Sequence, residues 1–295
     1  MLSPELMRQF RRLQLKAKRA VQSLLEGRYH SAFRGTGLTF EEVRDYQPGD
    51  EIRSIDWNVT ARMGSPFVKR FVEDRELTVM IVADLSGSAA FGSEMSTKRN
   101  VLAELVALVA FSAVSNQDRV GLIAGGTGVG RHLRPDRGPT HALRLLRDVF
   151  FFEPEDRRTD VKGLLDFLNR VYRRRAIVFL FSDFLDTGFE KALPLTGRAH
   201  DLIVVRVGDR REEELPDSGL VRLRDEETRR TLLVDTSDKR LRREFAARAD
   251  HRRESLQKLT RAASADLVEV TTDGEHLDTL VRFFQARQRR LRRGG

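Results

Sequence analysis

The stretch LTVMIVADLSGS, residues 77–88, decides the fold class. Its first part, Leu77–Ala83, is apolar at every position except Thr78, and a strand with that pattern must be covered on both faces. The run Ala176–Phe181 (AIVFLF) has the same character, and Asp201–Val207 (DLIVVRV) nearly so. Buried strands that alternate with helical segments are typical of a parallel sheet between two layers of helices. We therefore predict an α/β fold with a doubly wound, mostly parallel, Rossmann-like sheet.

The spacing of apolar residues predicts the other elements. Helical periodicity and capping residues favour helices at seven segments: 4–27, 95–115, 139–150, 160–174, 187–197, 238–264 and 275–291. Further strands are expected at 119–124 and 266–270, a hairpin edge at 125–134, and a hairpin that pairs 220–223 with 231–234. Residues 28–75 are punctuated by Gly and Pro without a helical period, so we expect loops and short strands there. A boundary near residue 73 would separate an N-terminal helix-plus-loop extension (1–73) from the α/β domain (74–295).

The composition excludes several classes of protein. The chain contains no Cys, which removes disulfides, thiolate nucleophiles and Cys-ligated metal sites. No apolar run reaches the roughly 18 residues of a membrane-spanning helix, and the first residues lack the apolar core of a secretory signal, so we expect a cytoplasmic protein. With 53 Lys+Arg against 44 Asp+Glu the formal net charge is +9, and the basic excess lies toward the two ends. Nucleic acid, an anionic membrane surface and an acidic protein all fit that charge.

Polar side chains follow two of the predicted buried strands at the point where each strand ends. Asp84, Ser86 and Ser88 come directly after the first strand, and Asp183 follows the strand at 176–181. In open α/β sheets the ligand site lies outside the carboxyl ends of the strands. Carboxylate and hydroxyl oxygens are hard ligands, which suit Mg²⁺, Mn²⁺ or Ca²⁺ and disfavour zinc or copper. The sequence therefore predicts a metal site at this edge of the sheet.

Two motifs resemble known families. Asp84-x-Ser86-x-Ser88 together with Asp183 resembles the metal-ion-dependent adhesion site of von Willebrand factor A domains. The segment GLTFEEVRDYQPGDEIRSIDWNVTAR, residues 37–62, resembles the bacterial family called domain of unknown function 58 (DUF58). The resemblance covers roughly residues 30–290 and implies a von Willebrand factor A-like domain, in a family whose members are typically associated with MoxR-type AAA+ ATPases.

The resemblance also implies a role for each site residue. Thr159 matches the threonine of a third metal-binding loop, so that Ser86, Ser88 and Thr159 would supply hydroxyl oxygens and Asp84 and Asp183 carboxylates. One coordination position would stay open for an acidic residue of a partner. Such a site coordinates and does not turn over a substrate, so we expect no catalytic residues and no enzymatic activity. The expected function is a metal-dependent interaction module, an adaptor between a MoxR-type ATPase and its client protein.

A nucleic-acid-binding protein and a hydrolase are the alternative functions. A basic nucleic-acid-binding protein would use the charged ends, but no basic stretch is interleaved with aromatic residues. A metal-dependent hydrolase would need a general base beside the metal, and no His stands at the strand ends. The glycine-rich run 125–130 lacks the Lys-Ser/Thr of a phosphate loop and is better explained by a hairpin turn. The polar cluster around Trp57, formed by Asp50, Arg53 and Asp56, is either a packed structural loop or a partner-contact surface.

Overall fold

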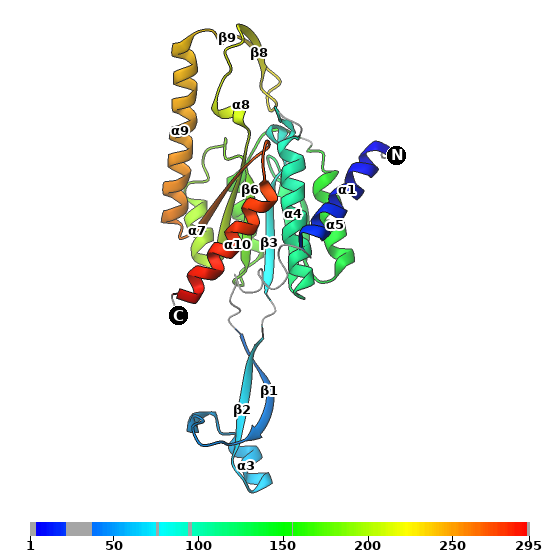
Figure 1. The fold of residues 1–295 in the computed structure, drawn as a ribbon, viewed down its shortest axis with the longest axis vertical. Coiled ribbons are helices and arrows are strands. Elements are labelled where there is room, and N and C mark those ends of the chain that lie inside the picture. Colours follow the sequence, from blue (N-terminus) through cyan, green and yellow to red (C-terminus); the bar gives the residue numbers. More distant parts are fainter. Residues whose placement is uncertain (1–3, 22–36, 75–76, 94–95, 155, 294–295) are drawn as a thin grey trace. The chain divides into compact units, whose positions relative to one another are not determined.

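A computed structural model describes residues 4–21, 37–74, 77–93, 96–154 and 156–293 of the chain (Figure 1). Its main sheet has six strands in the order β10-β7-β6-β3-β4-β5, of which β5 alone runs antiparallel to its neighbour. The strands are β3 (Thr78–Asp84), β4 (Arg119–Gly125), β5 (Val129–Asp136), β6 (Ile177–Ser182), β7 (Asp201–Gly208) and β10 (Asp266–Thr271). This arrangement confirms the predicted doubly wound, mostly parallel α/β fold.

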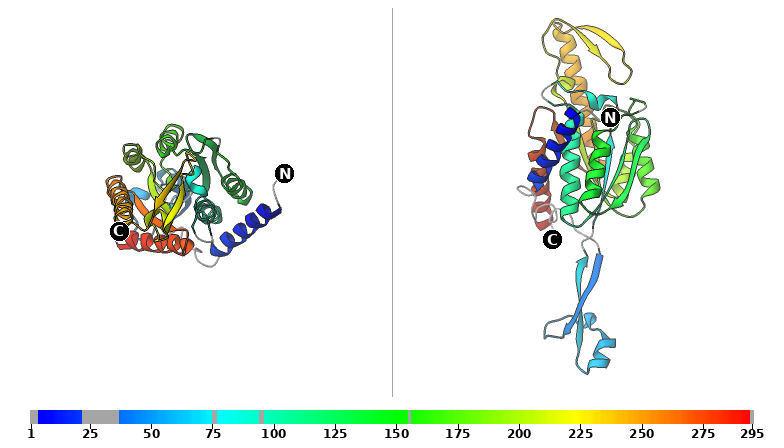
Figure 2. Two further views of the ribbon diagram at one scale, coloured as in Figure 1. Left: turned by 90° about the horizontal axis from the view of Figure 1, so that it is seen from above. Right: turned by 90° about the vertical axis from the view of Figure 1, so that its right-hand side faces the viewer.

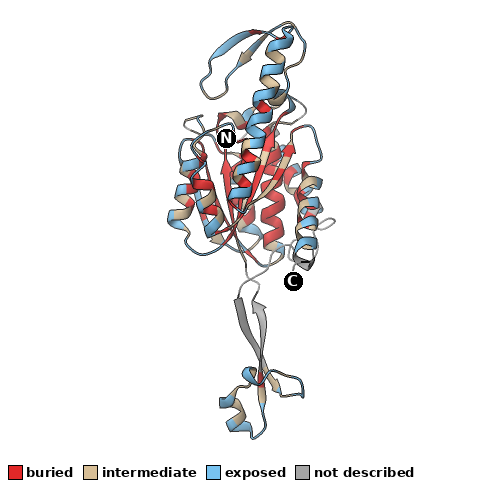
Figure 3. Ribbon diagram, turned by 90° about the vertical axis from the view of Figure 1, so that its left-hand side faces the viewer, coloured by how far each residue is buried: buried red, intermediate tan, exposed pale blue. Residues whose placement is uncertain are grey.

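Helices cover both faces of this sheet (Figure 2). One face carries α4 (Lys98–Ser115), α5 (Pro139–Phe150) and α10 (His276–Arg293), and the other α6 (Val161–Val171), α7 (Ala192–Ala199) and α9 (Lys239–Ala262). Helix α4 is apolar on several faces because the sheet, α5, α10 and α1 (Pro4–Ala20) all pack against it. The buried residues gather at the sheet and at the inner sides of its helices (Figure 3). No helix among the described residues is long and apolar enough to span a membrane.

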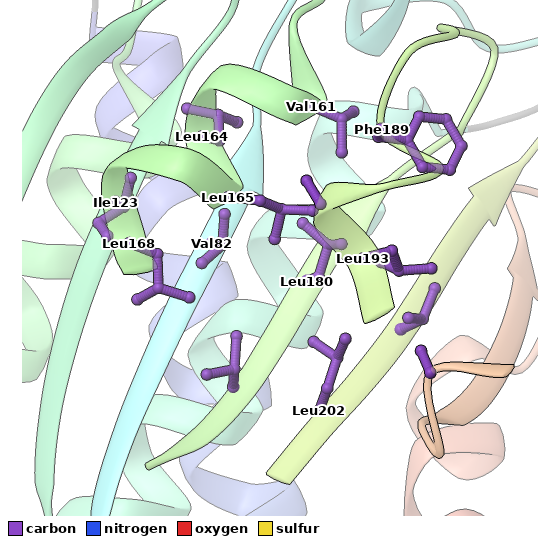
Figure 4. Close-up of a cluster of buried hydrophobic side chains, with 14 of the residues drawn as sticks. Val82, Ile123, Val161, Leu164, Leu165, Leu168, Leu180, Phe189, Leu193 and Leu202 are labelled. Carbon is purple, nitrogen blue, oxygen red and sulfur yellow. The ribbon is translucent and has the colours of Figure 1, made fainter. Parts of the chain in front are cut away.

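The core between the sheet and α6 and α7 explains why the strands are apolar throughout. Val82, Ile123 and Leu180 of three strands meet Leu165 and Leu193 of the two helices (Figure 4). Each such aliphatic side chain stabilises the fold by about 1.5–3 kcal/mol when it is fully buried. The packing on both faces fixes the carboxyl ends of β3 and β6 side by side.

Contacts divide the chain into two compact units, Met1–Ala32 with Thr78–Gly295, and Phe33–Leu77. In this division α1 groups with the α/β unit. Phe10 of α1 lies 5.7 Å from the ring of Phe150, and Lys16 bonds to Glu104 of α4. Residues 22–27, which the sequence assigned to the first helix, lie outside the described residues.

The unit Phe33–Leu77 contains β1 (Gly37–Asp45) paired antiparallel with β2 (Phe67–Asp74), the 3₁₀ turn η2 (Ile52–Ser54) and helix α3 (Trp57–Met63). Helix α3 corrects the expectation of loops and strands alone. It forms because Asp56 caps the amides of Asn58 and Val59, and it ends at Gly64, whose φ of 76° is left-handed.

The remaining helices and strands lie near their predicted positions, with differences at α7 and α8. Hairpin β8 (Leu220–Arg224) and β9 (Thr231–Asp235) pairs as expected. Helix α7 begins five residues later than the predicted 187, and the short α8 (Arg210–Glu213), capped by Asp209, was not predicted. The 3₁₀ turn η3 (Gly87–Ala90) begins within the DLSGS stretch.

Candidate metal centre

The candidate centre lies at the carboxyl ends of β3 and β6, which are neighbours in the sheet. Because β4 flanks β3 on its other side, this is the point where the strand order reverses, the usual place for a ligand in such folds. Asp84 ends β3 and Asp183 directly follows β6, and both are buried. Sequence reasoning thus placed the two carboxylates correctly at one edge of the sheet.

Hydrogen bonds fix the Asp84 carboxylate. Its Oδ1 accepts from the amide of Ser86 at 3.0 Å, and its Oδ2 accepts from the hydroxyl of Ser182 at 2.7 Å. Ser182 also accepts from the amide of Phe184 at 3.0 Å, which ties the end of β6 to the end of β3. Ser182 was not among the predicted site residues, although it immediately precedes Asp183.

The two serine hydroxyls fit a small octahedral cation. Ser86 Oγ and Ser88 Oγ lie 3.1 Å apart. Neighbouring oxygen ligands of Mg²⁺, each about 2.1 Å from the ion, are separated by about 3 Å. Ser86 is fully buried and Ser88 half-buried.

A lysine that the sequence analysis missed reaches into the same place. Lys98, the first residue of α4, is buried, and its Nζ lies 2.6 Å from Asp183 Oδ2 and 2.5 Å from Glu212 Oε1. Asp84, Ser88, Lys98, Ser182 and Asp183 line one small cavity. Neither Lys98 nor Glu212 belongs to a recognisable motif, because one begins a helix and the other lies in the short α8.

The charges in this cavity are unevenly balanced. Burial, and then the charge of Asp183, raise the pKa of Asp84 to about 7. Burial alone would raise the pKa of Asp183 too, but the charge of Lys98 and hydrogen bonds from Lys98 and Ser88 lower it. The ammonium therefore compensates Asp183, while Asp84 keeps a carboxylate whose ionised form lacks a counter-charge.

The third predicted loop lies beside the first, but its threonine turns to another partner. The amide of Gly87 donates to the carbonyl of Arg157 at 2.6 Å, and a Cβ added to Gly126 would lie 2.8 Å from Arg158 O and 3.6 Å from Ser86 Cα. The structure therefore brings this loop to the centre. The hydroxyl of Thr159, however, donates to Glu227 Oε1 at 2.6 Å.

The oxygen atoms at the site fit a hard cation bound largely by hydroxyl groups. Within the described residues, no three Asp, Glu, His or Cys side chains are grouped as around a metal ion. Asp84 and Ser88 nevertheless line one cavity, and the Ser86 hydroxyl lies beside that of Ser88; carboxylate and hydroxyl oxygens in this combination suit Mg²⁺ or Mn²⁺. The uncompensated Asp84 supplies the negative charge that such a cation requires.

Comparisons with known proteins place the chain among uncharacterised relatives. The model of the family "Protein of unknown function DUF58" matches residues 42–255. An uncharacterized protein of Mycobacterium bovis (Mb1516) is 33% identical over 292 residues, which cover 97% of this chain and 91% of that protein. The uncharacterized YeaD of Bacillus subtilis is 33% identical over 60 residues, 20% of this chain and 15% of that protein.

Two solved structures are similar to the chain at low sequence identity. BatB from Bacteroides thetaiotaomicron is similar with a TM-score of 0.46 and 14% identity, over 72% of this chain and 99% of that chain. The SpRpn10 VWA domain is similar with a TM-score of 0.43 and 15% identity, over 69% of this chain and 93% of that chain.

Proposed function

The chain belongs to the DUF58 family, and from that premise we propose that it is a metal-dependent protein-interaction module. One observation carries the proposal: Ser88 shares a cavity with Asp84, a buried carboxylate without a counter-charge, and its hydroxyl lies 3.1 Å from that of Ser86. We further propose that it acts in the cytoplasm as an adaptor between a MoxR-type AAA+ ATPase and a client protein. The support for that ATPase is the family resemblance of residues 37–62.

The proposed ligands are Asp84, Ser86 and Ser88, with Thr159 and Asp183 as the remaining members of the predicted set. A bound Mg²⁺, Mn²⁺ or Ca²⁺ would supply a positive centre that a carboxylate oxygen of the partner can bind. Asp84 would provide charge, and the buried serines would hold two oxygens at a fixed separation. Lys98 keeps Asp183 ionised and in place, so Asp183 is proposed to act as a positioning group.

Arginines near the centre suit an acidic partner. Arg157 and Arg158 lie in the loop of Thr159, and Arg224 ends strand β8 beside it, paired at 3.5 Å with Glu226. Arg158 is exposed, as is Arg224. Exposed arginines around a cation-binding cleft attract a negatively charged segment and speed its association.

Melting with and without metal tests the site. We expect Mg²⁺ or Mn²⁺ at a hundredfold excess over Kd to stabilise the protein by about 2.7 kcal/mol, and Asp84→Ala to abolish the shift. Asp156→Ala, which removes a nearby exposed carboxylate bonded to Arg158, is the control and should keep the metal response. An unchanged response in Asp84→Ala would exclude the proposed centre.

A pull-down with and without Mg²⁺, read by mass spectrometry, tests the partner. Ser86→Ala and Asp183→Ala should lose capture of the ATPase or its client and keep the native far-UV spectrum. Asp183→Ala also removes the counter-charge of Lys98, so its melting temperature must be measured beside it. Capture as efficient as with wild type in both variants would show that recognition does not pass through a metal.

A further inference from the structure

The turn between β8 and β9 touches both loops of the candidate metal centre. A Cβ added to Gly87 would lie 2.7 Å from Glu226 O, so the turn packs closely on the DLSGS stretch. Arg157 Nη1 lies 3.5 Å from Glu226 Oε2, and the hydroxyl of Thr159 donates to Glu227 Oε1 at 2.6 Å. Two consecutive glutamates of one turn thus face the two loops.

The turn holds Glu227 in a defined position. Asp225 Oδ1 accepts from the amides of Glu227 at 2.8 Å and Thr228 at 3.2 Å, and its Oδ2 accepts from the Thr228 hydroxyl at 2.7 Å. These bonds form an Asx-type turn that fixes the backbone at Glu227 and Thr228. Glu227 and Thr159 are both half-buried, so the contact between them is partly shielded from water.

We propose that Glu227 is a built-in carboxylate ligand of the metal centre, in the place that a partner's acidic residue would take. This inference rests on the proposed function. Thr159 is the candidate ligand of the third loop, and its oxygen lies 2.6 Å from the Glu227 carboxylate. That separation is close to the roughly 3 Å between neighbouring oxygen ligands of a small cation. The predicted set has three hydroxyls and two carboxylates, and Lys98 already neutralises one of these, Asp183. A further carboxylate would add a hard, charged ligand.

The proposal gives the β8–β9 hairpin a role in binding. Glu227 belongs to the same chain, so its carboxylate is present at a high effective concentration. A partner's acidic residue must displace the Glu227 carboxylate from the metal ion. An isolated carboxylate binds too weakly to do so. The partner therefore needs an acidic residue within a larger docking segment that also engages the surrounding surface.

Glu227→Gln is the decisive variant, because the glutamine carbonyl can still accept the hydrogen bond from Thr159 while the charge is lost. Glu226→Gln, at the neighbouring position of the same turn, is the matched control. Mn²⁺ alone is the probe, titrated into the full chain and followed by the electron paramagnetic resonance signal of the free ion. We expect Glu227→Gln to raise the Mn²⁺ Kd by about tenfold and Glu226→Gln to leave it within about twofold.

A second readout separates ligation from a structural effect. Water should take the place of the lost carboxylate, so the water-proton relaxation enhancement of bound Mn²⁺ should rise in Glu227→Gln and stay unchanged in Glu226→Gln. Equal Mn²⁺ affinity and equal enhancement in Glu227→Gln and wild type, with Asp84→Ala losing the ion, would overturn the role of Glu227 and leave the metal centre standing. Wild type that binds no Mn²⁺, or Asp84→Ala that binds it normally, would overturn the proposed function and this inference with it.

Discussion

The ammonium nitrogen of Lys98 lies 2.6 Å from a carboxylate oxygen of Asp183, and the two side chains are 2% and 4% exposed. The same nitrogen lies 2.5 Å from Glu212, so one buried cation pairs with two carboxylates. A buried ion pair adds little net stability when compared with apolar residues of similar volume. The loss of one partner, however, leaves the remaining buried charges without a counter-charge, which destabilises the fold.

We expect Lys98→Met to lower the free energy of unfolding by about 3 kcal/mol or more, because Asp183 and Glu212 lose their shared counter-charge. Mg²⁺ should recover more stability in this variant than in wild type, since a cation can replace the missing charge. Urea unfolding with and without Mg²⁺ measures both effects. Lys162→Met is the control, because Lys162 pairs with Asp166 on an exposed helix face and should contribute less than about 1 kcal/mol. Equal losses in the two variants would contradict the prediction.

Asp84 should make stability depend on pH. Its pKa is raised to about 7 by burial and by the charge of Asp183, whereas an unfolded aspartate titrates near about 3.9. Between these values the native state binds more protons than the unfolded state, so the free energy of unfolding falls as pH rises, by at most about 1.4 kcal/mol per pH unit. Urea unfolding at several pH values should show this fall in wild type and a flatter profile in Asp84→Asn. Mg²⁺ should weaken the fall, because it favours the ionised carboxylate.

Asp156→Asn is the matched control for that profile. Its hydrogen bonds with Arg158 lower the pKa of Asp156 to about 2, so it remains ionised across the range in which Asp84 titrates. The profile of Asp156→Asn should therefore follow wild type. A profile in Asp84→Asn as steep as that of wild type would assign the pH dependence to other groups.

Helix α1 should be part of the α/β unit energetically as well as by contact. Phe10 is buried against Phe150 and Phe151, with ring centroids 5.7 and 5.4 Å away. Phe10→Ala is expected to cost about 3 kcal/mol of unfolding free energy. Leu15→Ala in the same helix, where the side chain is 57% exposed, should cost less than about 0.5 kcal/mol. Chemical denaturation of the two variants checks this, and a similar small loss in both would mean that α1 is not packed in solution.

Trp57 is 66% exposed, so it does not anchor a packed loop. Of the two explanations that the sequence left open, its exposure favours a contact surface, while the bonds from Arg44 to Asp50 at 2.7 and 2.8 Å show that the segment is also salt-bridged. We expect Trp57→Ala to change the free energy of unfolding by less than about 1 kcal/mol and to reduce capture of the partner. Asp56→Ala, which removes the cap of α3 at a cost of about 1 kcal/mol, controls for local unfolding. A large stability loss in Trp57→Ala would restore the structural explanation.

Nucleic-acid binding should be weak and steeply dependent on salt. Arginines of the basic C-terminal helix are partly neutralised, since Arg287 pairs with Asp201 and Asp266, and Arg290 lies 2.8 Å from Asp266. Fluorescence titration of single- and double-stranded DNA and RNA over a range of salt concentrations measures the affinity. Submicromolar, sequence-selective binding at physiological salt would contradict this expectation.

The fold could be predicted largely from strand composition. The strands β3, β6 and β7 are apolar because both faces are covered, and a run of that kind leaves few alternatives. The turn at Gly125–Gly130 correctly indicated an antiparallel edge, here β5. Helix α3 escaped prediction because seven residues carry too little periodicity, and its cap at Asp56 has the same composition as a turn.

The site residues could be predicted only where they lie close together in the sequence or directly follow a recognisable strand. Asp84, Ser86 and Ser88 lie within five residues, and Asp183 follows a strand whose position in the sheet is implied by its composition. Lys98 lines the cavity from the start of a helix, and Glu212 of a short helix contacts Lys98. These contacts depend on tertiary packing, which the spacing of residues in the sequence does not show. The contact of Thr159 with Glu227 is of this kind as well.

The route of the chain between α1 and β3 has a practical consequence. Helix α1 belongs to the α/β unit, the chain then forms the unit Phe33–Leu77, and it returns to the main sheet at β3. None of the six strands of that sheet comes from residues 37–74. The segment is therefore an insertion between α1 and β3, and it can be exchanged or altered without changes to the core of the α/β unit. A chimaera that carries this segment from another family member would transplant whatever it recognises onto an unaltered metal centre, and so separate the two contributions to partner choice.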